Sequence, residues 1–168
     1  VPLLAARLGL QGSSCEALVE EGWQCLWIDW PRNQLEDFRY QVAVQDFRGE
    51  WQPLDLAADG QLRERALLVW QPPAGYQGLI RPGQMADAIP WVRATLGVEW
   101  HGNWQVIGPA GSASATGQLA EQLYDPLLAN AVAEFQARHG LDADRIIGPQ
   151  TLLYLQRQLT PAADGNGG

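Results

Sequence analysis

The first apolar segments of the chain predict two short helices followed by a strand. Residues 1–10 suit a helix that ends at Gly9, and residues 13–21 begin with a pair of serines that can cap a helix N-terminus. The next segment, 23–30, is rich in aromatic and other apolar residues. Such composition favours a strand over a helix.

Alternating apolar and polar side chains predict a β-hairpin over residues 38–60. Every second residue from Phe38 to Val44 is apolar, which is typical of a half-buried strand, and 51–56 is expected to return beside it. A continuous apolar run at 66–71 predicts one more strand. The N-terminal part is therefore expected to be a small α+β domain with about four strands.

A Pro- and Gly-rich segment at 71–83 is expected to separate this part from a helical one. The first helix after it contains Pro90, so it either starts near Asp87 or kinks at the proline. Residues 98–118 predict a tight aromatic turn between short strands and then an exposed loop. The expected apolar face of the helix consists of Met85, Ile89, Val92 and Leu96.

The last two helices have clear start and stop signals. Asp125 and Pro126 are a preferred N-cap and first helical residue, and Gly140 ends that helix. The final helix starts at Gly148-Pro149. The two expected apolar stripes are Leu128, Val132 and Phe135, then Leu152, Leu155 and Leu159.

Charge and length exclude several classes of protein. The net charge is −8, and all 11 cationic side chains are arginine. Because nucleic-acid binding depends on clustered cations that neutralise phosphates, we expect no nucleic-acid partner. The absence of lysine also excludes the phosphate-binding P-loop. No apolar run is long enough to predict membrane insertion.

Two cysteines, Cys15 and Cys25, lie ten positions apart. If Ser13 or Ser14 caps the helix, a turn at Gly22 can bring the two sulfurs together. A disulfide there would imply an oxidising compartment. Two buried free thiols, or one reactive cysteine, are the alternatives.

The C-terminal stretch 124–156 resembles the peptidoglycan-binding domain of the PG_binding_1 type, a module of three helices. Residues 81–97 are similar to the first helix of that module, and Tyr124-Asp125 to the start of its second. One departure is Arg145, where the family usually has glycine, so the loop needs either a conformation open to other residues or a positive φ. The matching residues are Ala131, Val132, Phe135, Gln136, Gly140, Leu141, Asp144, Ile147, Gly148, Pro149, Thr151 and Leu155.

The order of segments along the whole chain resembles the periplasmic end of the general secretion pathway protein A family (ExeA type). The resemblance implies a periplasmic location, with an ATPase domain and an inner-membrane anchor elsewhere in the full-length protein. It also implies partners, namely peptidoglycan, a secretion pathway B protein and the type II secretion secretin. We therefore expect domains at 1–76 and 79–160, with an insert at 98–118 in the second, and a disordered tail at 161–168.

The N-terminal domain of that family is similar to cysteine peptidases, and we expect a degenerate, non-catalytic version here. Cys15 could open a helix after Gln11, but the only histidines are His101 and His139. His139 suits the end of a helix, where a cation is favoured. The histidine spacing predicts no zinc site, and no cofactor is expected. The alternatives are a wall hydrolase or cysteine peptidase targeted by the C-terminal module, and a protein-interaction module.

Binding of peptidoglycan is expected to use aromatic and cationic side chains. Sugar rings offer flat faces for aromatic stacking, and peptide stems offer carboxylates to arginine and to backbone N–H groups. Alternatively, Trp100 and Trp104 fill the seam between the domains, and Arg145 pairs with Asp142 or Asp144. The negative net charge predicts weak affinity, micromolar or poorer. The candidate contacts are Trp100, His101, Trp104, Tyr124, Arg138, Arg145 and Gln150.

Overall fold

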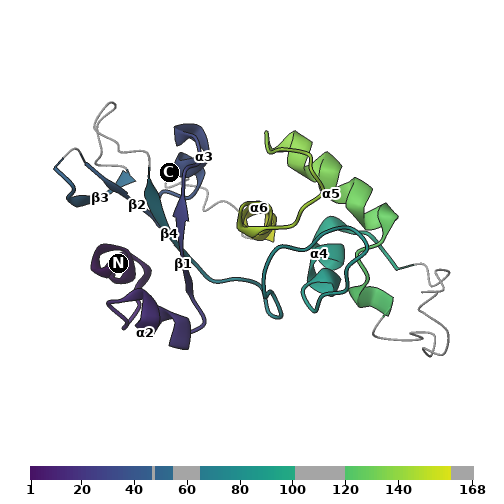
Figure 1. Cartoon of the computed structure of the whole chain (residues 1–168), viewed down its shortest axis with the longest axis horizontal. Coiled ribbons are helices and arrows are strands. Elements are labelled where there is room, and N and C mark those ends of the chain that lie inside the picture. Colours follow the sequence, from purple (N-terminus) through teal and green to yellow (C-terminus); the bar gives the residue numbers. More distant parts are fainter. Residues whose placement is uncertain (47, 55–64, 101–119, 160–168) are drawn as a thin grey trace, which may run out of the picture. The chain divides into compact units, whose positions relative to one another are not determined.

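The computed structural model combines helices with a four-stranded antiparallel sheet (Figure 1). The chain divides into two compact units, Val1–Pro72 and Pro73–Gly168. The mixed α+β character agrees with the prediction. The structure describes residues 1–46, 48–54, 65–100 and 120–159.

The sheet of the first unit has the order β1-β4-β2-β3, with antiparallel neighbours throughout. All five residues of β4 are buried, as the continuous apolar run of this segment predicts. The last strand in sequence therefore lies inside the sheet, between β1 and β2. The strands are β1 (Gln24–Ile28), β2 (Val42–Gln45), β3 (Trp51–Pro53) and β4 (Ala66–Trp70).

Two helices cover one face of this sheet, α1 (Pro2–Leu8) and α2 (Cys15–Glu20). Leu4 and Leu18, one from each helix, have no exposed surface. They pack on a cluster of strand residues, Ala43, Leu67 and Val69. Burial of this apolar face is the main stabilising contribution to the first unit.

A disulfide joins Cys15, the first residue of α2, to Cys25 on β1. The helix begins there because Ser14 is its N-cap and accepts a hydrogen bond from the Ala17 N–H at 3.2 Å. The two Cα atoms lie 5.8 Å apart, within the ordinary range for a disulfide. Of the three possibilities that the sequence left open, the disulfide is confirmed.

The predicted hairpin is wrong at its start. Residues 32–37 form a helix, α3 (Arg32–Asp37), and the strand begins only at Val42. Pro31 suits the residue just before a helix, and an ion pair between Arg32 and Glu36 supports the short helix. The alternation of apolar residues gave a wrong prediction here. Tyr40, expected on the apolar face of the strand, is 59 % exposed.

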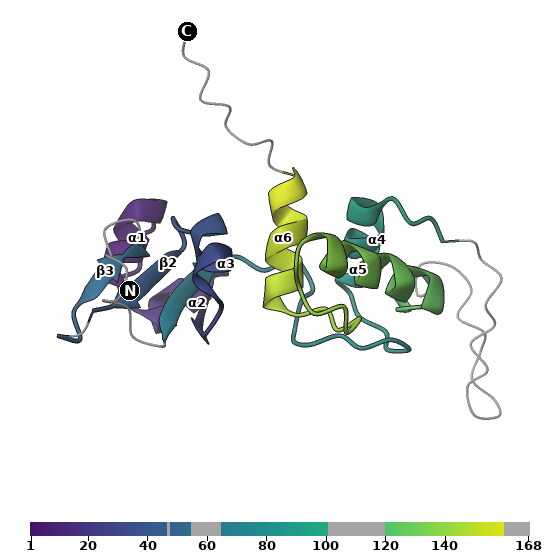
Figure 2. The same ribbon diagram turned by 90° about the horizontal axis from the view of Figure 1, so that it is seen from above.

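The second unit contains α4 (Ile89–Leu96), α5 (Pro126–Arg138) and α6 (Pro149–Leu159), with a 3-10 turn, η2 (Ala120–Gln122), before α5 (Figure 2). Asp125 caps α5 as predicted, because its carboxylate accepts a hydrogen bond from the Leu128 N–H at 2.8 Å. The fully buried side chains are Ile89, Val92, Tyr124, Leu128, Val132, Phe135, Ile147, Leu152 and Leu155.

Two residues of the predicted apolar stripes, Met85 and Leu159, are exposed, and a third, Leu96, is half-buried. Met85 is 45 % exposed, because α4 starts at Ile89, close to Pro90, and never reaches it. Leu159 is 58 % exposed at the last position of α6. Residue spacing predicts an apolar stripe along the whole helix, but a side chain of that stripe is buried only where a neighbouring element packs against it.

Several predictions fall outside the described residues. These include most of the aromatic turn and loop of 98–118, the tail at 161–168, and Leu56 of the predicted hairpin. Within the described part of the chain, no helix has the length and apolar character needed to cross a membrane. In the same residues no group of three or more metal-ligating side chains comes together.

Breaking the disulfide is expected to destabilise the first unit. Cys15→Ser with Cys25→Ser should lower its free energy of unfolding by about 2–3 kcal/mol, because the bridge closes a short loop in the unfolded chain. Urea unfolding followed by tryptophan fluorescence measures this. A reductant should reproduce the loss in the parent chain and leave the double variant unchanged. Equal stability of the reduced and oxidised parent chain would contradict the prediction.

Candidate functional site

A buried glutamine, Gln136 on α5, organises the loop between α5 and α6. It is 2 % exposed. Its Nε2 lies 3.0–3.1 Å from three acceptors, Asp144 Oδ1, the Ile146 carbonyl and Thr151 Oγ1. Its Oε1 accepts a hydrogen bond from the Arg145 N–H at 3.0 Å. One side chain thus satisfies polar groups from the loop and from the first turn of α6, where each would be costly to bury alone.

Tyr124 supports the same loop from the opposite end of α5. Its hydroxyl donates to the Arg145 carbonyl at 2.8 Å. Burial, and secondarily the negative charge of Asp144, raise the pKa of Tyr124 well above its ordinary value, so the hydroxyl remains a donor. The ring has no exposed surface, which corrects the expectation that Tyr124 contacts a ligand. Its role is to position the loop.

These contacts hold Arg145 in a left-handed conformation, with φ of 62°. Both its N–H and its carbonyl are hydrogen-bonded, to Gln136 and Tyr124 respectively. The Asp144 carboxylate accepts from the Ile146 N–H at 2.8 Å and tightens the turn across Arg145. This position therefore does require a positive φ, which costs a residue other than glycine about 1–2 kcal/mol. The Arg145 side chain is exposed.

Two other predicted contacts belong to the same part of the chain. Arg138 is the last residue of α5 and is exposed. Gln150 is half-buried in the first turn of α6. With Arg145 they flank the loop, where the two exposed arginines lie in the same stretch as two exposed aspartates, Asp142 and Asp144.

Trp100 lies on a different element, after the end of α4. The guanidinium of Arg93 faces its ring, with Cζ 5.1 Å from the ring centre. Arg93 is 4 % exposed and forms a buried ion pair with Asp125. It also donates to the carbonyls of Glu121 at 3.1 Å and Leu123 at 2.6 Å. Trp100 is half-buried over this ion pair.

Of three other residues that the sequence singled out, the structure describes only His139. His101 and Trp104, predicted to act with Trp100, lie outside the described residues. His139 packs between Phe135 and Tyr154, with ring centres 4.4 and 5.3 Å away, in agreement with a structural role.

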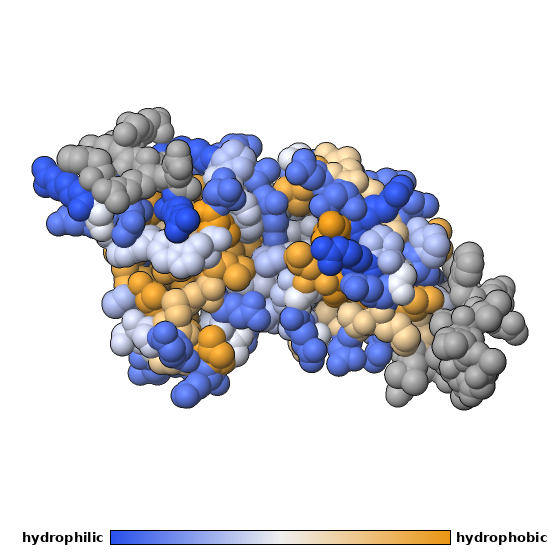
Figure 3. Space-filling view, viewed as in Figure 1, coloured by the Kyte–Doolittle hydropathy of each residue, from blue (hydrophilic) through white to orange (hydrophobic). Residues whose placement is uncertain are grey.

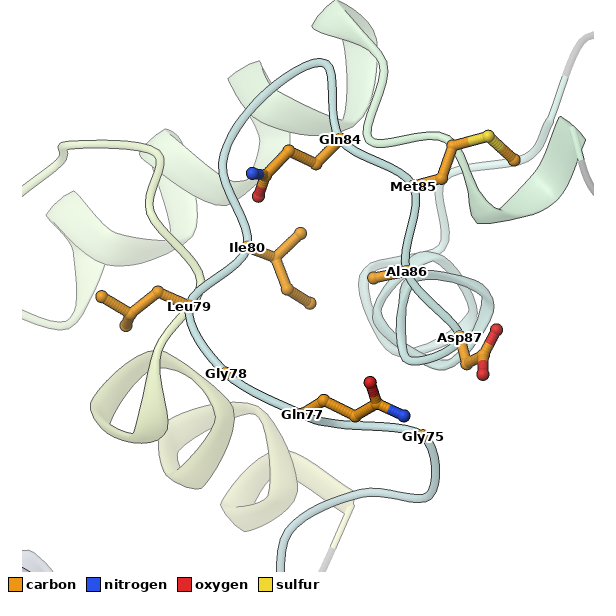
Figure 4. Close-up of a pocket in the computed structure, with 9 residues that line it drawn as sticks. All are labelled: Gly75, Gln77, Gly78, Leu79, Ile80, Gln84, Met85, Ala86 and Asp87. Carbon is orange, nitrogen blue, oxygen red and sulfur yellow. The ribbon is translucent and has the colours of Figure 1, made fainter.

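Next to the Arg145 loop, the segment from Gly75 to Asp87 lines an open hollow of about 510 Å³. Reciprocal backbone hydrogen bonds of 2.9 and 3.0 Å join Ile80 to Ile147, so this segment and the loop are adjacent. Figure 4 shows the side chains of Gln77, Ile80, Gln84 and Ala86 directed toward the interior of the segment. The sequence predicted a domain boundary over 71–83 and a helix from about Met85 or Asp87 onward, and it gave no prediction of the hollow. The density of glycine and amide residues in this segment was the available signal.

Comparison with known proteins agrees with the C-terminal resemblance. Residues 112–155 match the family model described as "Putative peptidoglycan binding domain". The chain is also similar to the crystal structure of a periplasmic domain of the EpsAB fusion protein of the Vibrio vulnificus type II secretion system. That similarity has a TM-score of 0.42 and 15 % identity and covers 94 % of this chain and 76 % of that one. Among curated proteins, none matches significantly.

Replacing Arg145 by glycine is expected to stabilise the second unit. Arg145→Gly relieves the left-handed strain and should raise the free energy of unfolding by up to about 1 kcal/mol. Arg138→Gly, the matched control at a helical position, should lower it by about 1 kcal/mol. Thermal or urea unfolding of both variants tests this, and destabilisation by Arg145→Gly would show that the φ of 62° is not strained.

Removing the Gln136 amide is expected to loosen the loop. Gln136→Met keeps the volume of the side chain but leaves the Arg145 N–H and the Ile146 carbonyl without their partner, at a cost of about 2–3 kcal/mol. Amide hydrogen exchange should speed up first at residues 144–147. Unchanged protection of these amides would mean that the loop does not depend on Gln136.

Proposed function

We propose that this chain binds peptidoglycan in the periplasm without catalysing a reaction on it. The observation that carries the proposal is the exposed side chain of Arg145, whose backbone is fixed by hydrogen bonds to residues of the family motif. Gln136 and Asp144, with Thr151, belong to that motif, and their hydrogen bonds are directed at the loop. The hydrogen bonds of these residues fix the shape of the loop, and the Arg145 side chain is exposed where a ligand can reach it.

The chemistry of peptidoglycan suits this arrangement. Its peptide stems carry carboxylates, and a guanidinium can bind a carboxylate through two parallel hydrogen bonds. Fixing the backbone at Arg145 before binding reduces the entropy lost on association. The rest of the chain is acidic, so long-range attraction to a carboxylate-bearing polymer is absent and the affinity is weak, micromolar or poorer.

Further contacts and the domain assignment are part of the proposal. The wall-binding domain spans 79–160 with the insert at 98–118, and Trp100, His101 and Trp104 of that insert stack on sugar rings. Arg138 and Gln150 extend the contact made by Arg145. Trp100 also has a structural role, because its ring lies against Arg93, which is paired with Asp125.

The N-terminal domain, 1–76, is a degenerate relative of cysteine peptidases in this proposal. Cys15 occupies the first turn of a helix, where a peptidase places its nucleophile. The disulfide to Cys25 ties up that sulfur, and a thiolate cannot form while the bridge is intact. This favours a binding role over the hydrolase and peptidase alternatives. The order of segments along the chain supports service in assembling the type II secretion secretin, with a B protein as partner.

Sedimentation with protein-free peptidoglycan sacculi tests the proposal. The parent chain should sediment with the sacculi, and Arg145→Ala should weaken binding about five- to tenfold, as expected for the loss of about 1–1.4 kcal/mol. Arg157→Ala removes the same charge from an exposed position in the last turn of α6 and should have little effect. If the parent chain stays in solution at every salt concentration, wall binding is ruled out.

A further inference from the structure

The open hollow lined by residues 75–87 has walls of a distinctive chemistry, uncharged amides beside small apolar groups. Gln77 and Gln84 supply two amides, and Ile80 and Ala86 supply the apolar surface (Figure 4). Its volume of about 510 Å³ lies in the range of small-ligand sites. Arginine is absent from this lining, so the hollow differs in kind from the neighbouring surface at Arg145.

The amide of Gln84 has a defined orientation. Its Oε1 accepts a hydrogen bond from the Arg81 N–H at 2.8 Å. The acceptor end of the side chain is therefore engaged by the protein, and the Nε2 group, with two hydrogens to donate, is available to a ligand. A ligand that fits must offer a carbonyl oxygen to this donor.

The backbone of the segment keeps the hollow open. Gly75 has a φ of 79°, and a Cβ there would lie 2.5 Å from the Asp87 Cβ. Gly148, beside the Arg145 loop, is similarly close-packed, since its Cβ would lie 2.8 Å from the Leu79 side chain. Glycine at both points allows the two segments to approach and shapes the space between Gly75 and Asp87.

We propose that this hollow binds the acetamido group of an N-acetylated sugar. The methyl group would pack on Ile80 and Ala86, and the acetamido carbonyl would accept a hydrogen bond from Gln84. Asp87 is also part of the lining, and Figure 4 shows its carboxylate directed away from the interior. Sugar and peptide stem would then be bound by adjacent surfaces, the hollow and the Arg145 loop, joined through the Ile80–Ile147 bridge.

This inference deepens the proposed function and rests on it for the source of the sugar. An alanine-containing peptide also places a methyl group beside an amide, so the stem itself is the competing source of the same chemistry. The glycan is favoured because the lining contains amides and apolar groups but no cationic side chain that could bind the carboxylates of the stem.

Titration of the full chain with a tetramer of N-acetylglucosamine, followed by NMR, tests the inference. The side-chain NH2 signals of Gln77 and Gln84 should shift, and the fully deacetylated tetramer should bind at least tenfold more weakly. The deacetylated sugar is cationic and the protein is acidic, so a purely electrostatic interaction would give the opposite order. Equal or tighter binding of the deacetylated sugar overturns the inference, as does a peptide of alanines that shifts the same signals more strongly.

Two variants locate the site. Ala86→Leu should fill the hollow and weaken binding of the acetylated tetramer at least tenfold, while Gln77→Ala should weaken it severalfold. Ala137→Leu, the same change on an exposed position of α5, should leave it unchanged. Loss of binding in Ala137→Leu, or none in Ala86→Leu, overturns the assignment of the hollow.

The parallel sacculus assay separates this inference from the proposed function. A chain that sediments with sacculi but does not bind the acetylated tetramer contradicts the hollow's role and leaves wall binding standing. A chain that binds the tetramer through Ala86 but never sediments contradicts wall binding and leaves the acetamido site standing.

Discussion

The second unit depends on one buried polar side chain, that of Gln136. A lone amide in an apolar core costs more free energy than it contributes, unless each of its atoms finds a partner. Here the partners come from the loop after α5 and from the start of α6, so α5 and α6 become linked through polar contacts as well as apolar packing. The loop has little freedom left, and Arg145 takes a conformation that it would avoid in isolation.

Specific links between neighbouring elements also stabilise two other parts of the molecule. Arg93 links α4 to the segment before α5 through Asp125, which also caps α5. In the first unit a covalent bond, Cys15–Cys25, joins a short helix to the edge strand β1. In each case a short element that would be marginal alone is stabilised by a specific link to its neighbour, because six- to eight-residue helices have little stability of their own.

Much of the fold was predictable because its signals are local. Ser14 and Asp125 were recognisable as caps, and the motif around Gln136 pointed to the peptidoglycan-binding family. The strand was predicted to start at Phe38, before its actual start at Val42, because a period of two over Phe38–Val44 resembles a strand whether or not a neighbouring strand exists. For the candidate site, sequence spacing could place Tyr124 near the loop but could not distinguish a ligand contact from a buried support.

The sequence by itself determined the starts of α2 and α5, through their caps, and the buried run of β4, since each follows from chemistry within a few residues. Only the tertiary structure decided that Tyr124 faces inward, that Cys15 is bonded to Cys25, and that the 75–87 segment lies against the Arg145 loop. These depend on which distant residues meet, and the free energy of such contacts is not encoded in any one stretch of the chain.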